Sequence, residues 1–410
     1  MSHSIIFGIE NEFSLYDSAE RIKSPLILNE IISNLEEPYF LELRKEKGYK
    51  LLHCYRFKSG GSFYIDDGGF PEVTSAPSYL FPGSITALIN NLNMNKNVIA
   101  STINKINQSK QTNYYLKGWS THFNFSFQNK DKMCFAKDKI PFFLMATVNP
   151  AIYLFIQYQQ SQGVMYRYRK DSRNEICGDY LATSKKMLQA LAFLSLIFST
   201  IFSMRDKSEK EISHFFYYSL KDKNYQTTKS RPGYLLHLPE VLQKGRAALL
   251  SFIDPYGKEY LMTAQNYLEF LYDKIQSSAH TVLNQAEENL LREAIFGQSK
   301  LPCDSLSFDA NCFRLQVEQM QNSEFMNPLA EAFGQSIKPI VINPYVKLQP
   351  LSITWEKINY SLHYFNTLST ISITLPHLRD FFYQLENWKT ASFFNAHNFF
   401  DFIKNYQIQS

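Results

Sequence analysis

Alternating apolar and polar residues predict a first strand close to the start of the chain. Apolar and polar positions partly alternate along residues 4–15. Successive side chains of a strand point to opposite faces, so Glu10 and Glu12 share one face while Ile9 and Phe13 lie on the other. Two carboxylates are therefore expected side by side on one face of a strand.

Two further segments of the first 130 residues also predict strands. Residues 62–66 are a short, largely apolar run flanked by pairs of glycines, which permit turns. Residues 119–127 alternate strictly between polar and apolar. The apolar face of this third strand carries Phe123, Phe125 and Phe127, and its polar face carries His122, Asn124 and Ser126.

Helices are expected to dominate after residue 140. Residues 84–107, rich in Asn and Ile, predict one earlier helix. The later helices are expected at about 141–160, 184–203, 260–276 and 280–296, the last ended by Gly297. Polar runs at 205–210 and 221–233 indicate loops. Residues 338–351 precede a C-terminal block in which a strand at 352–356 and then aromatic helices are expected.

The most apolar stretch, residues 187–204, is interpreted as a buried core helix. Five Gln, Ser and Thr residues interrupt it, and it has about the shortest length that can span a bilayer. The first residues carry neither a basic segment nor a small-residue cleavage site, which argues against an export signal. We therefore expect no membrane partner and a cytoplasmic protein.

Composition supports a globular protein. Of 410 residues, 45% are hydrophobic and only 31 are Gly or Pro, so most of the chain can bury a core. The net charge of +4 is small, and the densest basic run, residues 166–170, is too short to follow a nucleic-acid backbone, so no nucleic-acid partner is expected. Five cysteines without a C-x-x-C pair argue against a disulfide framework and a Cys-rich zinc site.

Polar residues that can bind a cation gather on or beside each of the three strands. The first strand offers Glu10 and Glu12, the second segment Asp66, Asp67 and Glu72, and the third His122 and Asn124. Each set alone is typical of a solvated face, a turn or a core histidine. Together, opposite apolar strand faces, they favour a ligand-lined sheet, because clustered carboxylates repel unless a cation is present. Oxygen-rich sets with one His suit magnesium or manganese better than zinc.

Three motifs resemble one enzyme family. Residues 8–13 (GIENEF) resemble the G-I-E-x-E-[FY] opening of the Pup ligase and depupylase family, a branch of the glutamine synthetase- and γ-glutamylcysteine synthetase-like carboxylate–amine ligases. Residues 61–75 (GSFYIDDGGFPEVTS) are similar to its G-[AS]-x-[FY]-Y-x-D-x-x-x-x-P-E-Y-x-[ST] segment. Residues 118–125 (GWSTHFNF) are similar to its G-x-x-x-H-x-N-[YF] strand. The three occur in the family's order over the first third of the chain.

The resemblance implies roles for individual residues. It places Glu10, Glu12, Glu72 and His122 as ligands of Mg²⁺ around the phosphates of ATP, Tyr64 and Asn124 as lining of the nucleotide site, and Asp66 as the catalytic residue. In such a ligase the substrate carboxylate becomes an acyl phosphate, and Asp66 takes the proton of the attacking amine.

A fourth segment, residues 173–183 (RNEICGDYLAT), partly resembles the family's basic strand and Gly-Asp turn. The resemblance makes Arg173 the phosphate-binding arginine, with Arg167 and Arg169 as rivals; a surface basic loop is the alternative. The chain departs from the family pattern at Val73, at 76–77 and at Phe123. None of these departures falls on a proposed metal ligand. They bear instead on whether the substrate is a macromolecule, as in the family.

The resemblance implies an α+β fold: a curved antiparallel sheet cradle backed by helices, glutamine synthetase-like. We expect a catalytic domain over residues 1–337 and a small C-terminal α/β unit over 338–410. The implied function is an ATP- and Mg²⁺-dependent ligase that joins a carboxylate donor to an amine acceptor, with a small protein or peptide tail as one candidate substrate. The alternatives are a depupylase-like amidohydrolase or phosphotransferase, and a nucleotide-binding pseudoenzyme.

Aromatic residues are unusually frequent, with 34 Phe and 26 Tyr. In the first third they alternate with the proposed ligands and are expected to form the apolar underside of the sheet. The C-terminal aromatic cluster is expected to pack the last helices, with a partner surface as the alternative. Its members are Phe381, Phe382, Trp388, Phe393, Phe394, Phe399, Phe400 and Phe402.

Overall fold

The structure is a computed structural model of the chain. It describes residues 5–22, 25–35, 40–46, 49–66, 69–127, 143–158, 163–168, 173–221, 225–227, 234–305, 314–315, 336, 338–353, 357–364, 367–390 and 395–406. Phe393 and Phe394 of the C-terminal aromatic cluster lie outside these residues, as do Asp67 and Arg169.

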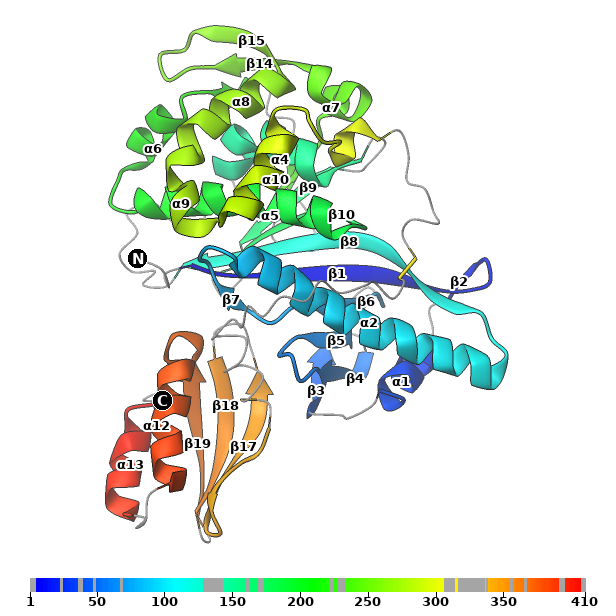
Figure 1. The fold of residues 1–410 in the computed structure, drawn as a ribbon, viewed down its shortest axis with the longest axis vertical. Coiled ribbons are helices and arrows are strands. Elements are labelled where there is room, and N and C mark those ends of the chain that lie inside the picture. Colours follow the sequence, from blue (N-terminus) through cyan, green and yellow to red (C-terminus); the bar gives the residue numbers. More distant parts are fainter. Residues whose placement is uncertain are drawn as a thin grey trace.

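Twelve described strands form one large antiparallel sheet built around two long neighbours, β1 (Ile5–Asp17) and β8 (Tyr114–Phe127). Beyond β8 follow β10 (Asn174–Asp179), β9 (Val164–Tyr168), β13 (Tyr234–Leu236) and β12 (Tyr225–Thr227). Beyond β1 follow β6 (Pro71–Thr74), β5 (Ser62–Ile65), β4 (Tyr49–Arg56) and β3 (Phe40–Glu46), and the short strands β2 (Glu20–Ile22) and β7 (Ser78–Tyr79) also pair with β1. In Figure 1 β1 and β8 run across the middle of the molecule as long, curved strands.

Two helices cover the apolar face of this sheet, as the alternation of the first strands predicts. They are α2 (Ser84–Lys110) and α5 (Ser184–Ser203). Phe125 of β8 stacks on Phe198 of α5 with ring centroids 4.2 Å apart, and Phe13 of β1 is fully buried. The expected α+β class, with an antiparallel sheet backed by helices, is confirmed.

The helix α5 is long and apolar enough to cross a membrane by length and composition alone. However, 78% of its most apolar 18-residue window is buried inside the protein. The core-helix interpretation of this segment agrees with that burial.

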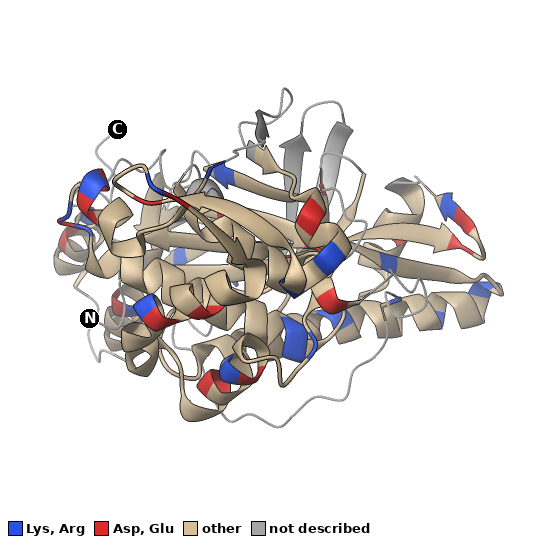
Figure 2. Cartoon of the chain, turned by 90° about the horizontal axis from the view of Figure 1, so that it is seen from above, with Lys and Arg blue, Asp and Glu red and all other residues tan. Residues whose placement is uncertain are grey.

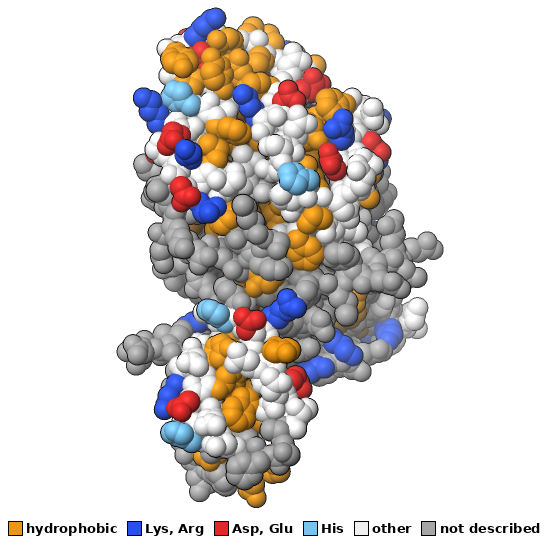
Figure 3. All heavy atoms as spheres, turned by 60° about the vertical axis from the view of Figure 1, so that its left-hand side comes forward, with side chains coloured by type: hydrophobic (Ala, Val, Ile, Leu, Met, Phe, Trp, Pro, Cys, Tyr) orange, Lys and Arg blue, Asp and Glu red, His pale blue; other side chains and the backbone are white. Residues whose placement is uncertain are grey.

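A group of further helices gathers at the upper end of the molecule in Figure 1, whereas α1 (Pro25–Ser33) lies beside the far end of α2. They are α4 (Asn149–Ile156), which follows a π-helical turn at Leu144–Val148, α6 (Glu209–Phe216), α7 (Pro239–Lys244), α8 (Ala264–Ile275), α9 (Ala279–Val282) and α10 (Gln285–Ile295). Short 3₁₀ turns occupy Gly245–Ala247, Gln276–Ser278 and Pro302–Asp304. A small sheet of β11 (Ser219–Leu220), β14 (Leu249–Ile253) and β15 (Glu259–Thr263) lies at the same end, where Figure 3 shows hydrophobic side chains gathered on the surface.

The C-terminal residues form a separate sheet with its own core. The strands β16 (Ile340–Asn343), β17 (Val346–Ile353), β18 (Lys357–Tyr364) and β19 (Thr367–Thr374) pair in sequence order, beside α12 (Leu375–Thr390) and α13 (Ala396–Lys404). Phe381 and Phe399 are fully buried here, as the core interpretation of the aromatic cluster requires. Ile6 of β1 and Tyr79 of β7 belong to this second core, so the main sheet supplies part of it. The domain boundary at residue 338 stays a prediction.

Several element boundaries differ from those expected, for local reasons. Residues 259–263 pair with β14 as a strand, so the helix expected from 260 starts at 264, where the side chain of Thr263 caps it. The helix expected over 280–296 is interrupted, and Asn284 forms a capping box that starts α10. The loop expected over 221–233 contains β12. The hairpin of β18 and β19 was not expected from the sequence.

One buried carboxylate joins α2 to α10. Glu287 is fully buried and accepts hydrogen bonds from the backbone N–H groups of Gly83 and Thr86, both at 2.9 Å. It also accepts from the Thr86 hydroxyl at 2.9 Å and from the N–H of its own cap, Asn284, at 3.0 Å. Four donors satisfy this carboxylate, so it needs no cation. Elsewhere Figure 2 shows Lys and Arg interspersed with Asp and Glu over the described residues.

A glycine next to the site makes room for an aromatic ring. Gly118 on β8 has the ring of the buried Tyr180 so close that an added Cβ would lie 2.1 Å from Cδ1. We expect Gly118→Ala to lower the free energy of unfolding by about 1–3 kcal/mol, the usual cost of overpacking. In a Tyr180→Ala background the same substitution should cost much less, and equal costs in the two backgrounds, measured by denaturant unfolding, would contradict this packing explanation.

Candidate active site

The register of the central strands aligns polar residues in rows across the sheet. On β1, Glu12 lies opposite Glu72 of β6 on one side and Ser120 of β8 on the other. Glu10 lies opposite His122, and His122 lies opposite Cys177 of β10. Directly opposed residues of an antiparallel sheet place their side chains on the same face. The rows therefore bring together side chains that are far apart in the sequence.

A bulge interrupts β8 beside these rows. Glu12 pairs with Ser120 but Phe13 pairs with Gly118, so Trp119 is the extra residue. Its side chain is half exposed and stacks on Phe70, with ring centroids 5.5 Å apart. Bulges are frequent next to active sites, because they redirect side chains without breaking the sheet.

Three carboxylates converge at one end of the rows. Oxygen atoms of Glu12, Asp66 and Glu72 all lie within 4.8 Å of one another. Glu12 and Glu72 are buried, whereas Asp66 is partly exposed at the end of β5. Tyr64, opposite Glu72 in the register, donates a hydrogen bond of 2.6 Å to it.

This crowding affects protonation. Burial, together with the charges of Glu10 and Glu12, raises the pKa of Glu72 well above its usual range. A raised pKa means that the ionised form is disfavoured in the folded chain without a compensating cation. Carboxylate oxygens are the ligands that Mg²⁺ and Ca²⁺ prefer, so the donor set fits a hard divalent cation.

His122 lies at the centre of the rows. Its Nε2 lies 3.0 Å from Oγ of Ser120, which donates a 2.6 Å hydrogen bond to Glu12. Its Nδ1 lies 3.5 Å from Oε2 of Glu10 and 3.5 Å from Oε1 of Glu175. Burial by itself lowers the pKa of His122, but the neighbouring Cys177 and Glu12 outweigh burial and raise this pKa well above its usual range.

Two arginines hold the outer oxygens of these carboxylates. Nη1 of Arg173 lies 3.1 Å from Oε1 of Glu10 and donates to Oδ1 of Asn124 at 3.3 Å. Nη1 of Arg167 lies 3.3 Å from Oε2 of Glu175. Both expected arginine candidates in the described residues therefore reach the site.

Asn124 offers a donor to a ligand. Its side chain is fully buried, and its Nδ2 has no hydrogen-bond partner among the described residues. A buried amide N–H without a partner is costly, so such an atom points to an acceptor such as a phosphate or carboxylate. Together with Arg173, it fits an anionic group beside the carboxylates.

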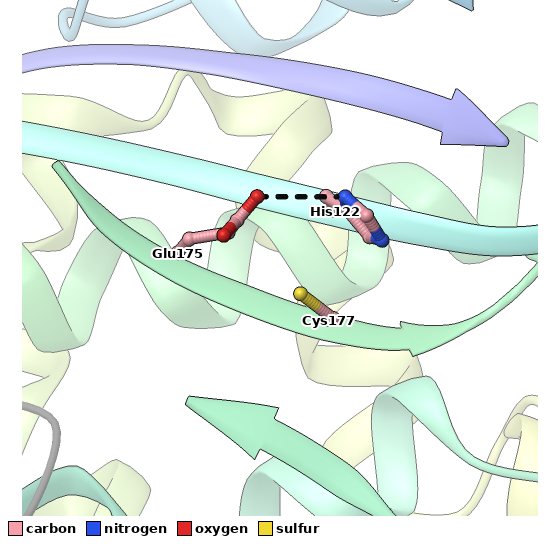
Figure 4. A group of neighbouring side chains, drawn as sticks. All are labelled: His122, Glu175 and Cys177. Carbon is pink, nitrogen blue, oxygen red and sulfur yellow. Dashed lines mark ion pairs between the residues drawn. The ribbon is translucent and has the colours of Figure 1, made fainter. Parts of the chain in front are cut away.

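A second group of possible metal ligands was not expected from the sequence. One ring nitrogen of His122, a carboxylate oxygen of Glu175 and the sulfur of Cys177 lie within 4.8 Å of one another, and all three residues are buried. Figure 4 shows Glu175 and Cys177 on one strand and His122 on its neighbour. The alternation along 173–179 was a usable signal, because Arg173, Glu175 and Cys177 occupy every second position of a strand.

The structure thus brings the eight residues to which the resemblance gives roles to one face of the sheet or its edge: Glu10, Glu12, Tyr64, Asp66, Glu72, His122, Asn124 and Arg173. The departures from the family pattern lie elsewhere. Val73 and Phe123 are fully buried, alternate with the site residues and so point to the apolar face. Ala76 is fully buried too. These substitutions leave the carboxylate face intact.

Comparison with known proteins adds evidence on the fold. No protein-family model matches the sequence, and no curated protein matches it. Among solved structures, the chain is similar to the crystal structure of the complex between the prokaryotic ubiquitin-like protein Pup and its ligase PafA. The match has a TM-score of 0.54 and 11% identity and covers 99% of this chain and 98% of the other. The resemblance expected from the three motifs is thus confirmed at the level of the fold: the chain has a Pup ligase-like, α+β scaffold.

Proposed function

We propose that the protein is an ATP- and Mg²⁺-dependent carboxylate–amine ligase that works in the cytoplasm. The observation that carries this proposal is the convergence of Glu12, Asp66 and Glu72 on one sheet face, two of them buried. We call these three carboxylates the carboxylate floor. On a Pup ligase-like scaffold, the carboxylate floor is suited to hold magnesium against the phosphates of a nucleotide.

In this proposal Glu10, Glu12, Glu72 and His122 hold Mg²⁺. ATP supplies the phosphoryl group that converts the donor carboxylate into an acyl phosphate. Arg173 and the unpartnered Nδ2 of Asn124 bind the phosphate oxygens. Tyr64 orients Glu72 through its hydroxyl hydrogen bond.

Asp66 acts as the base that prepares the amine. Of the three converging carboxylates it is the partly exposed one, at the turn between β5 and β6, so an incoming amine can reach it. An amine must lose a proton to attack an acyl group, and a carboxylate within hydrogen-bond distance can accept that proton.

The donor is proposed to be a carboxylate on a small protein or peptide tail, and the acceptor an amine. Support comes from the solved PafA structure, in which the ligase is in complex with the prokaryotic ubiquitin-like protein Pup. The amine then attacks the acyl phosphate, and phosphate leaves as the amide or isopeptide bond forms.

The first test neutralises a buried ligand while keeping its shape. We expect Glu72→Gln to abolish stabilisation of the protein by Mg²⁺ and ATP, which for the wild type should reach about 2.7 kcal/mol at a ligand concentration one hundred times Kd. Without divalent cations the variant should be as stable as the wild type or more so, because one of the mutually repelling carboxylates is gone.

Thermal unfolding with and without Mg²⁺ and ATP measures both effects. Glu240→Gln, at an exposed position on α7, serves as the matched control and should behave like the wild type. If Glu72→Gln retains full Mg²⁺-dependent stabilisation, the assignment of the carboxylate floor as the Mg²⁺ site is wrong.

The second test separates chemistry from binding. Asp66→Asn should lower the turnover number by roughly 10²- to 10⁴-fold, the usual contribution of a general base, while ATP binding survives. Turnover is measured as ADP release that requires both a carboxylate and an amine. ADP release that needs no amine would instead support a phosphotransferase or hydrolase, and full turnover of the variant would refute the role of Asp66.

The third test concerns the phosphate-binding arginine. Arg173→Ala should weaken ATP binding by about tenfold or more, because a charge-assisted hydrogen bond contributes about 1.5–3 kcal/mol. Arg205→Ala, outside the site on the loop after α5, is the control. Equal ATP affinity of Arg173→Ala and the control, measured by calorimetry, would exclude Arg173 from the nucleotide site.

A further inference from the structure

Three cationic side chains lie on the polar sheet face just beyond the carboxylate floor. Lys117 of β8 lies opposite Ser14 of β1, and Arg21 of β2 lies opposite Tyr16. Alternate residues of a strand share a face, so these pairs continue the face of the floor. Arg314 pairs with Lys117 in an isolated bridge. We call Arg21, Lys117 and Arg314 the cationic strip. In Figure 1 this part of β1 and β8 extends past β6 toward β2.

Arg21 is held next to Asp66 by two aromatic rings. Its Cζ lies 4.7 Å from the centroid of the Phe70 ring and 6.0 Å from that of the Trp119 ring. Phe70 belongs to the turn of Asp66, because the N–H of Asp66 donates to the carbonyl of Phe70 at 2.9 Å. Trp119 directly precedes Ser120 of the site. The guanidinium is therefore fixed at the edge of the site, beside the proposed base.

The other two cations of the strip also lie over aromatic rings. Nζ of Lys117 is 5.9 Å from the ring centroid of Tyr16, and Cζ of Arg314 is 3.7 Å from that of Tyr115. Tyr16 and Tyr115 stack on each other with centroids 5.3 Å apart. A ring attracts a cation placed over its face. These contacts use ring faces that a stacking nucleic-acid base would need, so the strip suits carboxylates better than bases.

The charges of the strip are not neutralised within the protein. None of its three cations forms an ion pair with a carboxylate in the part of the chain that the structure describes. Elsewhere the chain does pair such groups, as Arg246 pairs with Asp304 at 3.1 Å. Arg21 and Arg314 are also exposed. The strip therefore offers positive charge to an anionic ligand from solution.

The order of groups along β1 indicates which substrate reaches the strip. Asn124, the proposed phosphate ligand, lies opposite Gly8, and Glu12 of the carboxylate floor lies four residues further along β1. Tyr16, next to the strip, lies another four residues on. The phosphates and the strip thus lie on opposite sides of the floor. An amine that approaches Asp66 from the side away from the phosphates meets the strip.

We infer that the cationic strip binds the amine acceptor, and that this acceptor is a polypeptide segment in which acidic residues flank the reactive amine. The inference rests on the proposed function, because Asp66 receives an amine only in that reaction. Neighbouring register pairs on one strand face are about 7 Å apart. Cations spread over two such pairs suit several carboxylates along an extended chain, whereas a single small carboxylate would need only one of them.

The first measurement is binding, without ATP or a carboxylate donor. The probe is an acetylated, dye-labelled pentapeptide of four glutamates around one lysine. Full-length protein is added and fluorescence anisotropy is followed. We expect binding that weakens as salt is raised, because salt screens exposed charges. The same peptide with glutamines in place of the glutamates should bind about tenfold more weakly, since it lacks the charge pairs.

Variants of the strip test which cations are used. Arg21→Ala and Lys117→Ala should each weaken binding of the acidic peptide by about two- to fivefold, as expected for one exposed charge pair. The matched controls change cations that also lie over phenylalanine rings, on α10 and α8: Arg292 at 5.6 Å and Lys274 at 5.3 Å. Arg292→Ala and Lys274→Ala should bind the peptide like the wild type. Circular dichroism verifies that each variant is folded.

The second measurement locates the lysine of the bound peptide. A water-soluble carbodiimide activates a carboxylate, which then condenses with a neighbouring amine to form an amide, while the carbodiimide takes up the oxygen and leaves as a urea. We expect the peptide lysine to become joined to Asp66, as identified by mass spectrometry after proteolysis. Asp66→Asn should lose this adduct and keep its affinity for the peptide.

The inference is overturned if the acidic peptide does not bind, if the glutamine peptide binds equally well, or if Arg21→Ala and Lys117→Ala match their controls. Tighter binding of a single-stranded oligonucleotide of the same charge would also overturn it. If no adduct forms at Asp66, the strip does not hold the acceptor. Neither measurement uses ATP or a donor, whereas ADP release tests the ligase reaction, so failure of the strip and failure of the proposed function are distinguishable.

Discussion

Two glutamates lie directly opposite each other on neighbouring strands, and the rest of this site depends on how their charges are compensated. Glu12 and Glu72 are register partners on β1 and β6, and both are buried. Like charges at such positions destabilise a sheet, and burial adds a desolvation cost. Glu287 shows how the same chain treats a structural buried carboxylate, with four hydrogen-bond donors around it. In the described part of the chain Glu72 accepts only from Tyr64, so its remaining charge calls for a cation.

The apolar face keeps this arrangement in register. Asn11 lies between Glu10 and Glu12 in sequence but points to the opposite face, and its Nδ2 donates to Oγ1 of Thr121 on β8. That hydroxyl also accepts from the N–H of Leu181, just after β10. Phe13 and Phe123 pack on the same face and are fully buried. A slip by one residue would exchange these side chains with the carboxylates, so burial of the aromatic residues fixes where the carboxylates lie.

His122 connects two parts of the site that differ in chemistry. One ring nitrogen contacts Ser120 and the other faces Glu10 and Glu175. On one side lie the carboxylates of Glu12, Asp66 and Glu72, and on the other lie Glu175 and Cys177 of β10. Apart from Tyr64, whose hydroxyl donates to Glu72, and the rings that hold the cationic strip, the aromatic residues of the described chain have no role in the chemistry proposed for the site. Where described, these aromatic residues largely form the cores under the main sheet and under the C-terminal sheet.

The sequence alone was sufficient to decide which face of each early strand carries chemistry. Alternation has a period of two, so Glu10, Glu12, His122 and Asn124 could be placed on polar faces without knowing the fold. The buried helix of residues 184–203 could be predicted equally well, because twenty largely apolar residues need burial. The three motifs also pointed to the scaffold, which the structural comparison confirms.

Only the tertiary structure decided which strands become neighbours and in what register. Glu12 meets Glu72 across 60 positions of sequence, and His122 meets Cys177 across 55. Such pairings depend on the packing of α2 and α5 against the aromatic face, which no local pattern encodes. For the same reason the sequence does not place Glu175 and Cys177 beside His122, although their alternation is visible in it. Local periodicity determines the direction of a side chain, and long-range register determines what that side chain faces.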